Sequence, residues 1–178
     1  NLRHIAFIMD GNGRWGEKRN KSRNFGHLKG VEVIRKIIKG SIKLHIPIVS
    51  FYVFSSENWK RPKKEINFLF NLIESYFSKE IQNVIDQGIR IRILGEKKNL
   101  PIKIKKTLKY VEFLTEKNKK IIVNLAINYG SKNEILNSLK KIKKNITIKN
   151  FEKNLYTKNM PDPDILIRTG GQKRLSNF

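Results

Sequence analysis

The chain has 178 residues, of which 39% are hydrophobic and 10% aromatic, enough to build the core of one folded domain over residues 1–178. It has no cysteine, which excludes disulfide bonds and thiolate metal sites, and no run approaches the ~18 apolar residues of a membrane span. No signal peptide is apparent, so we expect a soluble cytoplasmic protein, and its net charge of +23 points to anionic partners such as nucleic acid, a membrane surface or phosphorylated substrates.

Short runs rich in Ile, Val and Phe alternate along the chain with longer segments of helical periodicity. The runs are typical of strands buried on both faces, and they span residues 4–9, 46–54, 89–94, 120–128 and 165–168. Apolar side chains recur at helical spacing in residues 31–42, 66–85, 102–118 and 132–144. This alternation predicts an α/β fold with a mainly parallel central sheet, helices on both faces and right-handed crossovers.

Polar residues and glycines follow each predicted strand. The longest such segments are residues 10–15, 55–62 and 169–177; Gly95-Glu96 and Tyr129-Gly130 follow the other two strands. They contain four of the ten arginines: Arg14, Arg61, Arg168 and Arg174. Arg23 and His27 lie on the first crossover, near enough to join them. Because ligands bind at the carboxyl ends of parallel strands, we expect one binding site there.

The segment Asp10-Gly11-Asn12-Gly13-Arg14-Trp15 combines a single acid with bare backbone and a guanidinium. Glycines let the backbone approach an anion, and arginine binds phosphate through two parallel hydrogen bonds. A phosphate would repel Asp10 unless Mg²⁺ lay between them. The pattern therefore favours a metal-assisted phosphate or diphosphate site; the alternative is a glycine-rich turn with an Asp cap.

Other motifs leave alternatives open. The spacing of Gly11, Gly13 and Gly16 matches a dinucleotide fingerprint, but residues 17–23 are too polar for the helix it requires, so we reject that cofactor. Residues 55–59 are either a hydrogen-bonding set for a substrate or a solvated turn with an anchoring tryptophan. His27 could also serve only near its helix start. The acids of residues 161–164 lie between prolines, which favours a turn over a metal site.

Four segments resemble the conserved blocks of the cis-prenyltransferases, in the family's order and over essentially the whole chain. They are residues 4–15 (HIAFIMDGNGRW), 23–27 (RNFGH), 54–62 (FSSENWKRP) and 163–178 (PDILIRTGGQKRLSNF). The resemblance implies a dimeric α/β enzyme with an apolar tunnel. It also implies repeated addition of isopentenyl diphosphate to farnesyl diphosphate, giving a long-chain cis-polyprenyl diphosphate. Undecaprenyl diphosphate, the carrier lipid of cell-wall glycans, is the expected product.

The resemblance also implies roles for individual residues. Asp10 would be the essential acid and would act through Mg²⁺, and Asn58 is the suggested proton acceptor. The allylic diphosphate would be held by Gly11, Asn12, Gly13, Arg14, Arg23 and His27, with Trp15 beside it. Isopentenyl diphosphate would be held by Arg168, Arg174, Leu175 and Ser176, and the site would be lined by Ser55, Ser56, Glu57, Trp59 and Arg61.

The sequence departs from the family pattern in two places. The family usually continues past Ser-Asn-Phe with an apolar strand and a second acidic Mg²⁺ ligand, and this sequence ends at Phe178. We therefore expect that ligand and part of the dimer interface to lie outside it. Gln172-Lys173 stands where the family often has Glu-His, and Lys173 can still meet a diphosphate.

Alternatives of other classes remain open from sequence alone. The charge is carried by 28 lysines and 10 arginines, which also suits a composition that simply favours lysine on solvated faces. A nucleic-acid-binding module would explain the charge, but aromatic residues are not interleaved with the basic runs as in a stacking platform, so we expect no nucleic-acid partner. Peripheral contact with an anionic membrane, a different product length and a noncatalytic partner subunit also remain open.

Overall fold

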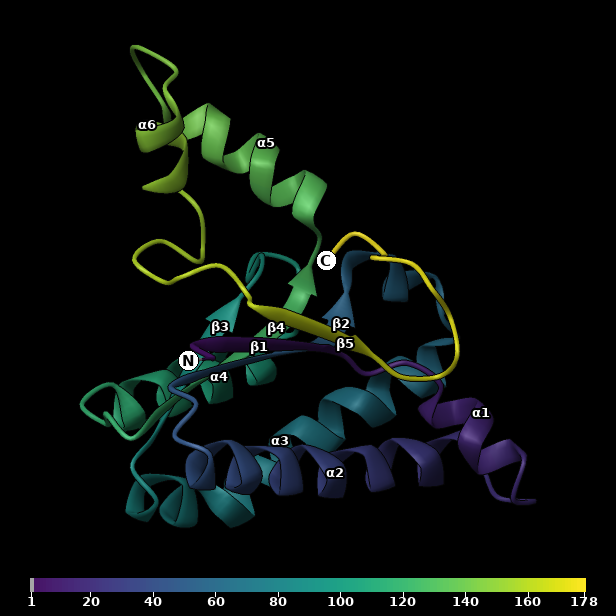
Figure 1. The fold of residues 1–178 in the computed structure, drawn as a ribbon. Helices are drawn as coiled ribbons and strands as arrows, with labels where there is room; N and C mark the ends of the chain where they lie inside the picture. Colours follow the sequence, from purple (N-terminus) through teal and green to yellow (C-terminus); the bar gives the residue numbers. More distant parts are fainter. Residues whose placement is uncertain (1) are drawn as a thin grey trace.

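The computed structural model describes residues 2–178, and its centre is a sheet of five parallel strands in the order β3-β4-β2-β1-β5 (Figure 1). The strands are β1 (His4–Ile8), β2 (Ile48–Ser55), β3 (Ile89–Leu94), β4 (Ile121–Tyr129) and β5 (Ile165–Arg168). Every neighbouring pair is parallel. The predicted fold class is confirmed, and all five predicted strands are present within two residues of their expected bounds.

The longer helices fall where apolar periodicity predicted them. They are α2 (Arg23–Lys43), α3 (Lys63–Asp86), α4 (Ile102–Thr115) and α5 (Ser131–Lys141). Helix α2 begins earlier than predicted, because the Ser22 hydroxyl caps it by accepting from the Phe25 amide. Short helices without an apolar stripe were not predicted: α1 (Asn12–Glu17), the 3₁₀ helix η1 (Ser56–Lys60) and α6 (Ile148–Glu152). No helix within residues 2–178 is long and apolar enough to cross a membrane.

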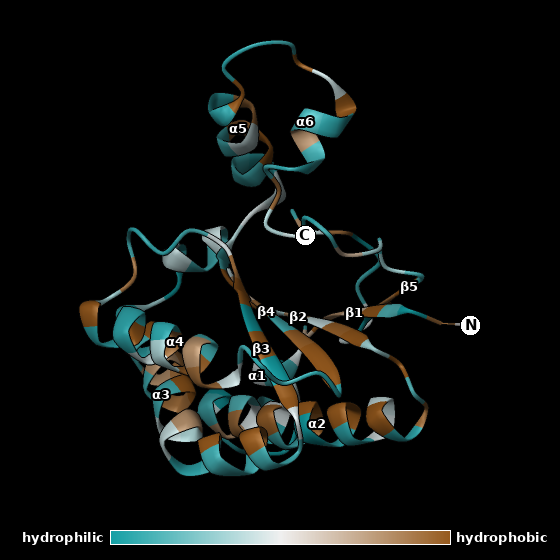
Figure 2. Ribbon diagram, turned by 90° about the vertical axis from the view of Figure 1, so that its left-hand side faces the viewer, coloured by the Kyte–Doolittle hydropathy of each residue, from teal (hydrophilic) through white to brown (hydrophobic). Residues whose placement is uncertain are grey.

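The main core lies between one face of the sheet and helices α2, α3 and α4. Phe51, Phe54 and Leu108 are almost fully buried there, and the Phe7 and Phe51 rings stack with centroids 5.3 Å apart. Helices α5 and α6 lie on the other side of the sheet and project away from it (Figures 1 and 2). That second face is contacted instead by Tyr156, Met160 and Phe178.

The register of the sheet brings distant parts of the chain to one edge. Strand β1 lies between β2 and β5, and its last residue, Ile8, is paired with Tyr52 on one side and Arg168 on the other. Because the strands are parallel, the segments that follow them leave the sheet at the same edge. Residues 9–15, 56–61 and 169–176 are thereby gathered around that edge.

Helix α1 packs backbone to backbone against the start of α2. A Cβ added at Gly26 would lie 1.8 Å from the Asn12 carbonyl oxygen, whereas a Cβ at Gly40, further along α2, would meet nothing within 4 Å. We predict that Gly26→Ala lowers the free energy of unfolding by roughly 1–3 kcal/mol through overpacking. Gly40→Ala, the matched control, should raise it by roughly 0.5–1 kcal/mol because alanine favours the helix. Urea denaturation measures both; equal effects would contradict this packing.

Candidate functional site

The Asp10 carboxylate, just beyond β1, is held by donors on both oxygens. Its Oδ2 accepts from Arg168 Nη2 at 2.7 Å, and its Oδ1 accepts from the Gly11 amide at 2.7 Å and from Arg14 Nη2 at 3.4 Å. Partial burial alone would raise the pKa of Asp10, but these hydrogen bonds and the charges of Arg168 and Arg14 outweigh it and lower the pKa. Asp10 is therefore ionised at neutral pH and keeps lone pairs for a cation.

Two glycine turns meet at this carboxylate. Gly11 and Gly170 have φ values of +86° and +80°, and a Cβ on Gly11 would lie 2.8 Å from the Gly170 Cα. Only glycine fits both the left-handed conformation and the close approach. The Thr169 hydroxyl donates to the Asp10 carbonyl at 2.7 Å, and Arg14 Nη2 donates to the Gly170 carbonyl at 3.3 Å. The turns after β1 and β5 thus form one structural unit.

Arg168 links that unit to the end of the chain. Its Nη1 donates to the Arg174 carbonyl and to the Ser176 hydroxyl, both at 2.6 Å, and its side chain is only 10% exposed. Its Nε is buried and has no acceptor within residues 2–178. The predicted residues of this segment are therefore close together, but the Arg174 contact is through its backbone, and the side chains of Arg174 and Leu175 are exposed.

A second charged cluster forms around Glu65, in the first turn of α3. Its Oε1 accepts from Arg61 Nη1 at 2.8 Å and lies 3.1 Å from His27 Nε2, while its Oε2 lies 3.5 Å from Arg23 Nε. Sequence analysis named the three cations and missed the carboxylate that joins them. The only signal available was its position four residues after Arg61 in a predicted helix.

The charge state of this cluster follows from its burial. Burial lowers the pKa of His27, and the charges of Arg61 and Arg23 lower it further, against the opposing effect of Glu65. The imidazole is then neutral at pH 7, and Nε2 must carry the proton because the Glu65 carboxylate can only accept. Burial would raise the pKa of Glu65, but His27, Arg61 and Arg23 together lower it. Both pKa values are depressed, so these groups contribute stability above their ordinary pKa values and lose it as the pH falls through the folded values.

The segment after β2 is organised by its own hydrogen bonds. Asn58 Oδ1 accepts from the Ser55 amide at 3.1 Å, which leaves its NH₂ group free to donate. Trp59 Nε1 donates to Asn128 Oδ1 at 2.8 Å, and its ring packs against Phe54 and Phe70. This is the anchoring tryptophan that sequence analysis held as an alternative. Glu57 is exposed, 3.4 Å from the Asn177 amide nitrogen, and a Cβ on Gly130 would meet the Ser56 hydroxyl.

The remaining predicted residues lie along α1. Trp15 stacks on Phe25 with centroids 6.1 Å apart and is 39% exposed, and the Arg19 guanidinium lies 4.1 Å above its ring. Gly13 is buried, and a Cβ there would lie 2.7 Å from the Arg23 guanidinium carbon. The absence of a side chain at residue 13 therefore leaves room for Arg23.

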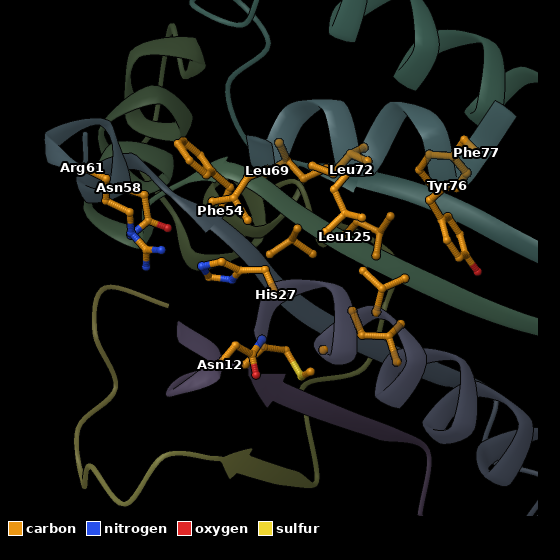
Figure 3. A pocket seen from close by; sticks show the side chains of 17 residues that line it. Asn12, His27, Phe54, Asn58, Arg61, Leu69, Leu72, Tyr76, Phe77 and Leu125 are labelled. Carbon is orange, nitrogen blue, oxygen red and sulfur yellow. The ribbon is translucent and has the colours of Figure 1, made fainter. Parts of the chain in front are cut away.

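Two cavities adjoin at this edge of the sheet. A polar cleft of about 590 Å³ is lined by Asp10, Gly11, Arg14, Lys18, Thr169 and Gly170, among others. An apolar cavity of about 150 Å³ lies between α2, α3 and the sheet, and both share Met9, Asn12 and Gly30. In Figure 3 the side chains of Arg61, Asn58 and His27 lie toward one end of the apolar cavity, and those of Tyr76 and Phe77 lie toward the other. A charged head and an apolar tail would therefore find complementary surroundings in sequence.

Metal-ligating side chains are sparse here. Within residues 2–178 no group of three or more His, Cys, Asp or Glu side chains is placed to hold an ion. Asp10 alone opens into the polar cleft together with the basic side chains of Arg14 and Lys18. This donor set fits Mg²⁺ bound together with a diphosphate, because Mg²⁺ takes one or two carboxylates and completes its shell with phosphate oxygens and water.

Comparison with known proteins points to one family. Residues 8–178 match the sequence profile of a prenyltransferase family described as putative undecaprenyl diphosphate synthase. An isoprenyl transferase of Fusobacterium nucleatum is 42% identical over 99% of this chain and 78% of its own length, and one of Prochlorococcus marinus is 43% identical over 98% and 68%.

Solved structures agree. A lavandulyl diphosphate synthase from Lavandula x intermedia, in complex with dimethylallyl diphosphate, superposes with a TM-score of 0.94 at 30% identity, covering 99% of this chain and 81% of that one. A probable undecaprenyl diphosphate synthase from Campylobacter jejuni gives 0.83 at 32% identity, covering 100% and 80%. The family resemblance found in the sequence is confirmed.

We predict that His27 titrates below its ordinary value of about 6.5, and that Glu65→Gln lowers its pKa further. The substitution removes the charge that favours the imidazolium and leaves Arg61 and Arg23 in place. NMR titration of the imidazole, assigned with His27→Gln, measures this. Glu17→Gln is the matched control, because Glu17 pairs with Arg23 at 3.2 Å and makes no hydrogen bond to His27. A pKa that stays or rises in Glu65→Gln would contradict the cluster.

Proposed function

The chain belongs to the prenyltransferase family described as putative undecaprenyl diphosphate synthase, and we propose that it adds isopentenyl diphosphate repeatedly, in cis, to farnesyl diphosphate. Family membership supports prenyl chain elongation as the activity. The observation that carries the proposal is the polar cleft around Asp10, which adjoins an apolar cavity at Asn12 and Gly30. The related lavandulyl enzyme holds dimethylallyl diphosphate, which is also an allylic diphosphate.

We place the allylic diphosphate at the turn formed by Gly11, Asn12 and Gly13, beside Arg14. The Gly11 turn leaves backbone exposed toward the cleft, and guanidinium groups match phosphate oxygens geometrically. Arg23, His27 and Arg61, held by Glu65, stand where α2 and α3 flank the neighbouring cavity. The prenyl tail would then extend between Ile34, Leu69 and Tyr76, away from water.

We place isopentenyl diphosphate at Arg168, Arg174 and Ser176. Arg168 carries a buried Nε without an acceptor among residues 2–178, and a buried donor of this kind is stabilised when an acceptor is supplied. Its Nη1 already positions the backbone of Arg174 and the hydroxyl of Ser176. Two diphosphates would then lie on either side of Asp10, each beside its own arginines.

Asp10 would hold Mg²⁺ together with a substrate diphosphate. When bound, the ion would neutralise the charge that develops on the departing diphosphate as the allylic C–O bond breaks. Arg14 and Arg168 would support the same charge from opposite sides of Asp10. The protein thus supplies donors that are already in place before the substrate arrives.

The condensation also releases a proton from isopentenyl diphosphate. Sequence analysis gave Asn58 as its acceptor, but the Asn58 carbonyl oxygen is engaged by the Ser55 amide, and an amide is a weak base. We propose that Asn58 orients the reacting groups through its free NH₂ and that the proton passes to diphosphate or water.

Several finer statements belong to the same proposal. We propose undecaprenyl diphosphate as the product and cell-wall glycan carrier lipid as its use, on the strength of the family description and the Campylobacter jejuni structure. A homodimer is expected from the family, and strand β5 carries apolar side chains that are each 40% exposed: Ile165, Leu166 and Ile167. Activity in the cytoplasm against a membrane surface would suit the product.

We predict that the protein, given farnesyl diphosphate, labelled isopentenyl diphosphate and Mg²⁺, forms a ladder of prenyl diphosphates that ends near C55 and disappears with EDTA. Asp10→Ala should lower turnover by roughly 100-fold or more, because it removes the metal ligand. Asp162→Ala, an exposed acid in the turn before β5, is the matched control and should leave the ladder intact. A ladder that persists in Asp10→Ala would contradict the assigned role.

We predict that Ile34→Trp shortens the longest product, because residue 34 lines the apolar cavity and a larger side chain there reduces the space for the tail. Lys36→Trp, on the exposed side of the same helix, should give the wild-type distribution. Chromatography of the dephosphorylated products compares the two. Equal distributions in all three proteins would place the growing chain elsewhere.

A further inference from the structure

Helix α4 has an outer face that no other part of residues 2–178 covers. Its inner face is buried through Ile104, Leu108, Val111 and Thr115, which pack with the core against β3 and α3. The outer face carries large apolar side chains: Ile102 is 72% exposed, Tyr110 59% and Phe113 67%. Figures 1 and 2 show α4 at the margin of the molecule, on the β3 side of the sheet.

Lysines share this face with the apolar side chains. Residues 102, 106, 109, 110, 113 and 117 follow helical spacing, so they project from one side. Lys106, Lys109 and Lys117 are exposed and have no ion-pair partner within residues 2–178; Lys103 pairs with Glu74 at 2.6 Å. Of the two acids on this segment, Glu112 turns inward to accept from the Ile93 amide at 2.8 Å, and only Glu116 is exposed. The face is therefore apolar and strongly cationic at once.

This combination identifies the chemistry of its partner. A helix that lies in a membrane interface buries a stripe that includes aromatic side chains and surrounds it with lysines, whose stems extend along the apolar surface toward headgroup phosphates. None of the outer-face residues lines the polar cleft or the apolar cavity, so the face has no part in the proposed chemistry. A polar protein surface would match the lysines and leave Ile102, Tyr110 and Phe113 unpaired.

We propose that the outer face of α4 docks the protein on membranes that contain anionic lipids. The helix has 14 residues and would lie parallel to the surface, with Ile102, Tyr110 and Phe113 among the acyl chains and the lysines at the headgroups. The proposal rests on this face alone and requires no activity of the catalytic site. It would place a maker of long apolar chains at the phase that dissolves them.

Co-sedimentation with vesicles tests the proposal without substrates. The full chain should bind vesicles of phosphatidylcholine with about 30% phosphatidylglycerol, bind pure phosphatidylcholine at least roughly tenfold more weakly, and lose affinity as salt rises. Replacing Ile102, Tyr110 and Phe113 together by serine should weaken anionic binding roughly tenfold or more. These positions are exposed, so the variant should keep the circular dichroism of the wild type.

The matched control replaces Ile146 and Ile148 by serine. These residues, before and at the start of α6, are 74% and 78% exposed and also stand among lysines. The control should bind anionic vesicles as the wild type does. An equal loss in both variants, binding unchanged in the α4 variant, or a change of oligomeric state in the α4 variant on size-exclusion chromatography with light scattering would each overturn the assignment of α4 to lipid.

Discussion

The ion pair between Asp10 and Arg168 is the contact on which the arrangement of the site depends. It joins residues 158 positions apart, and it exists because β1 and β5 are adjacent and parallel, with Ile8 opposite Arg168. Removing either partner would leave the other charge partly buried and uncompensated, which is costly. The pair therefore sets the distance between the two glycine turns and keeps a nearly buried guanidinium in place before any ligand binds.

The same logic recurs at Glu65. Arg23, His27 and Arg61 come from α2 and from the segment before α3, and without a carboxylate between them the cations would repel one another. Each set of anion-binding cations thus has an internal anion that balances it. The two anions differ in access: Asp10 is 27% exposed and can take a metal ion, whereas Glu65 is 12% exposed and already bonded to several donors. One is suited to a ligand role and the other to holding its neighbours in position.

Much of this could be predicted from the sequence, for identifiable reasons. Runs such as residues 48–55 are buried on both faces and therefore continuous in hydrophobicity, and the parallel-strand rule then brings their ends together. The functions of Glu65, Trp59 and the Asn58 carbonyl were not predictable, because they depend on side-chain direction across tertiary contacts. Helix α1 was missed because it is fixed by backbone packing against Gly26 and has no apolar stripe.

The two kinds of cation are distributed by the anion each would meet. Arginines stand at the strand ends, where a diphosphate presents fixed oxygens that a planar guanidinium can bind through paired hydrogen bonds. Lysines dominate the outer face of α4, where headgroups form a fluid surface that rewards mobile point charges on long apolar stems. The net charge of +23 alone cannot separate these uses. The fold separates them, because it places arginines beside cavities and lysines beside exposed apolar side chains, so one excess of charge serves a catalytic pocket and a docking face.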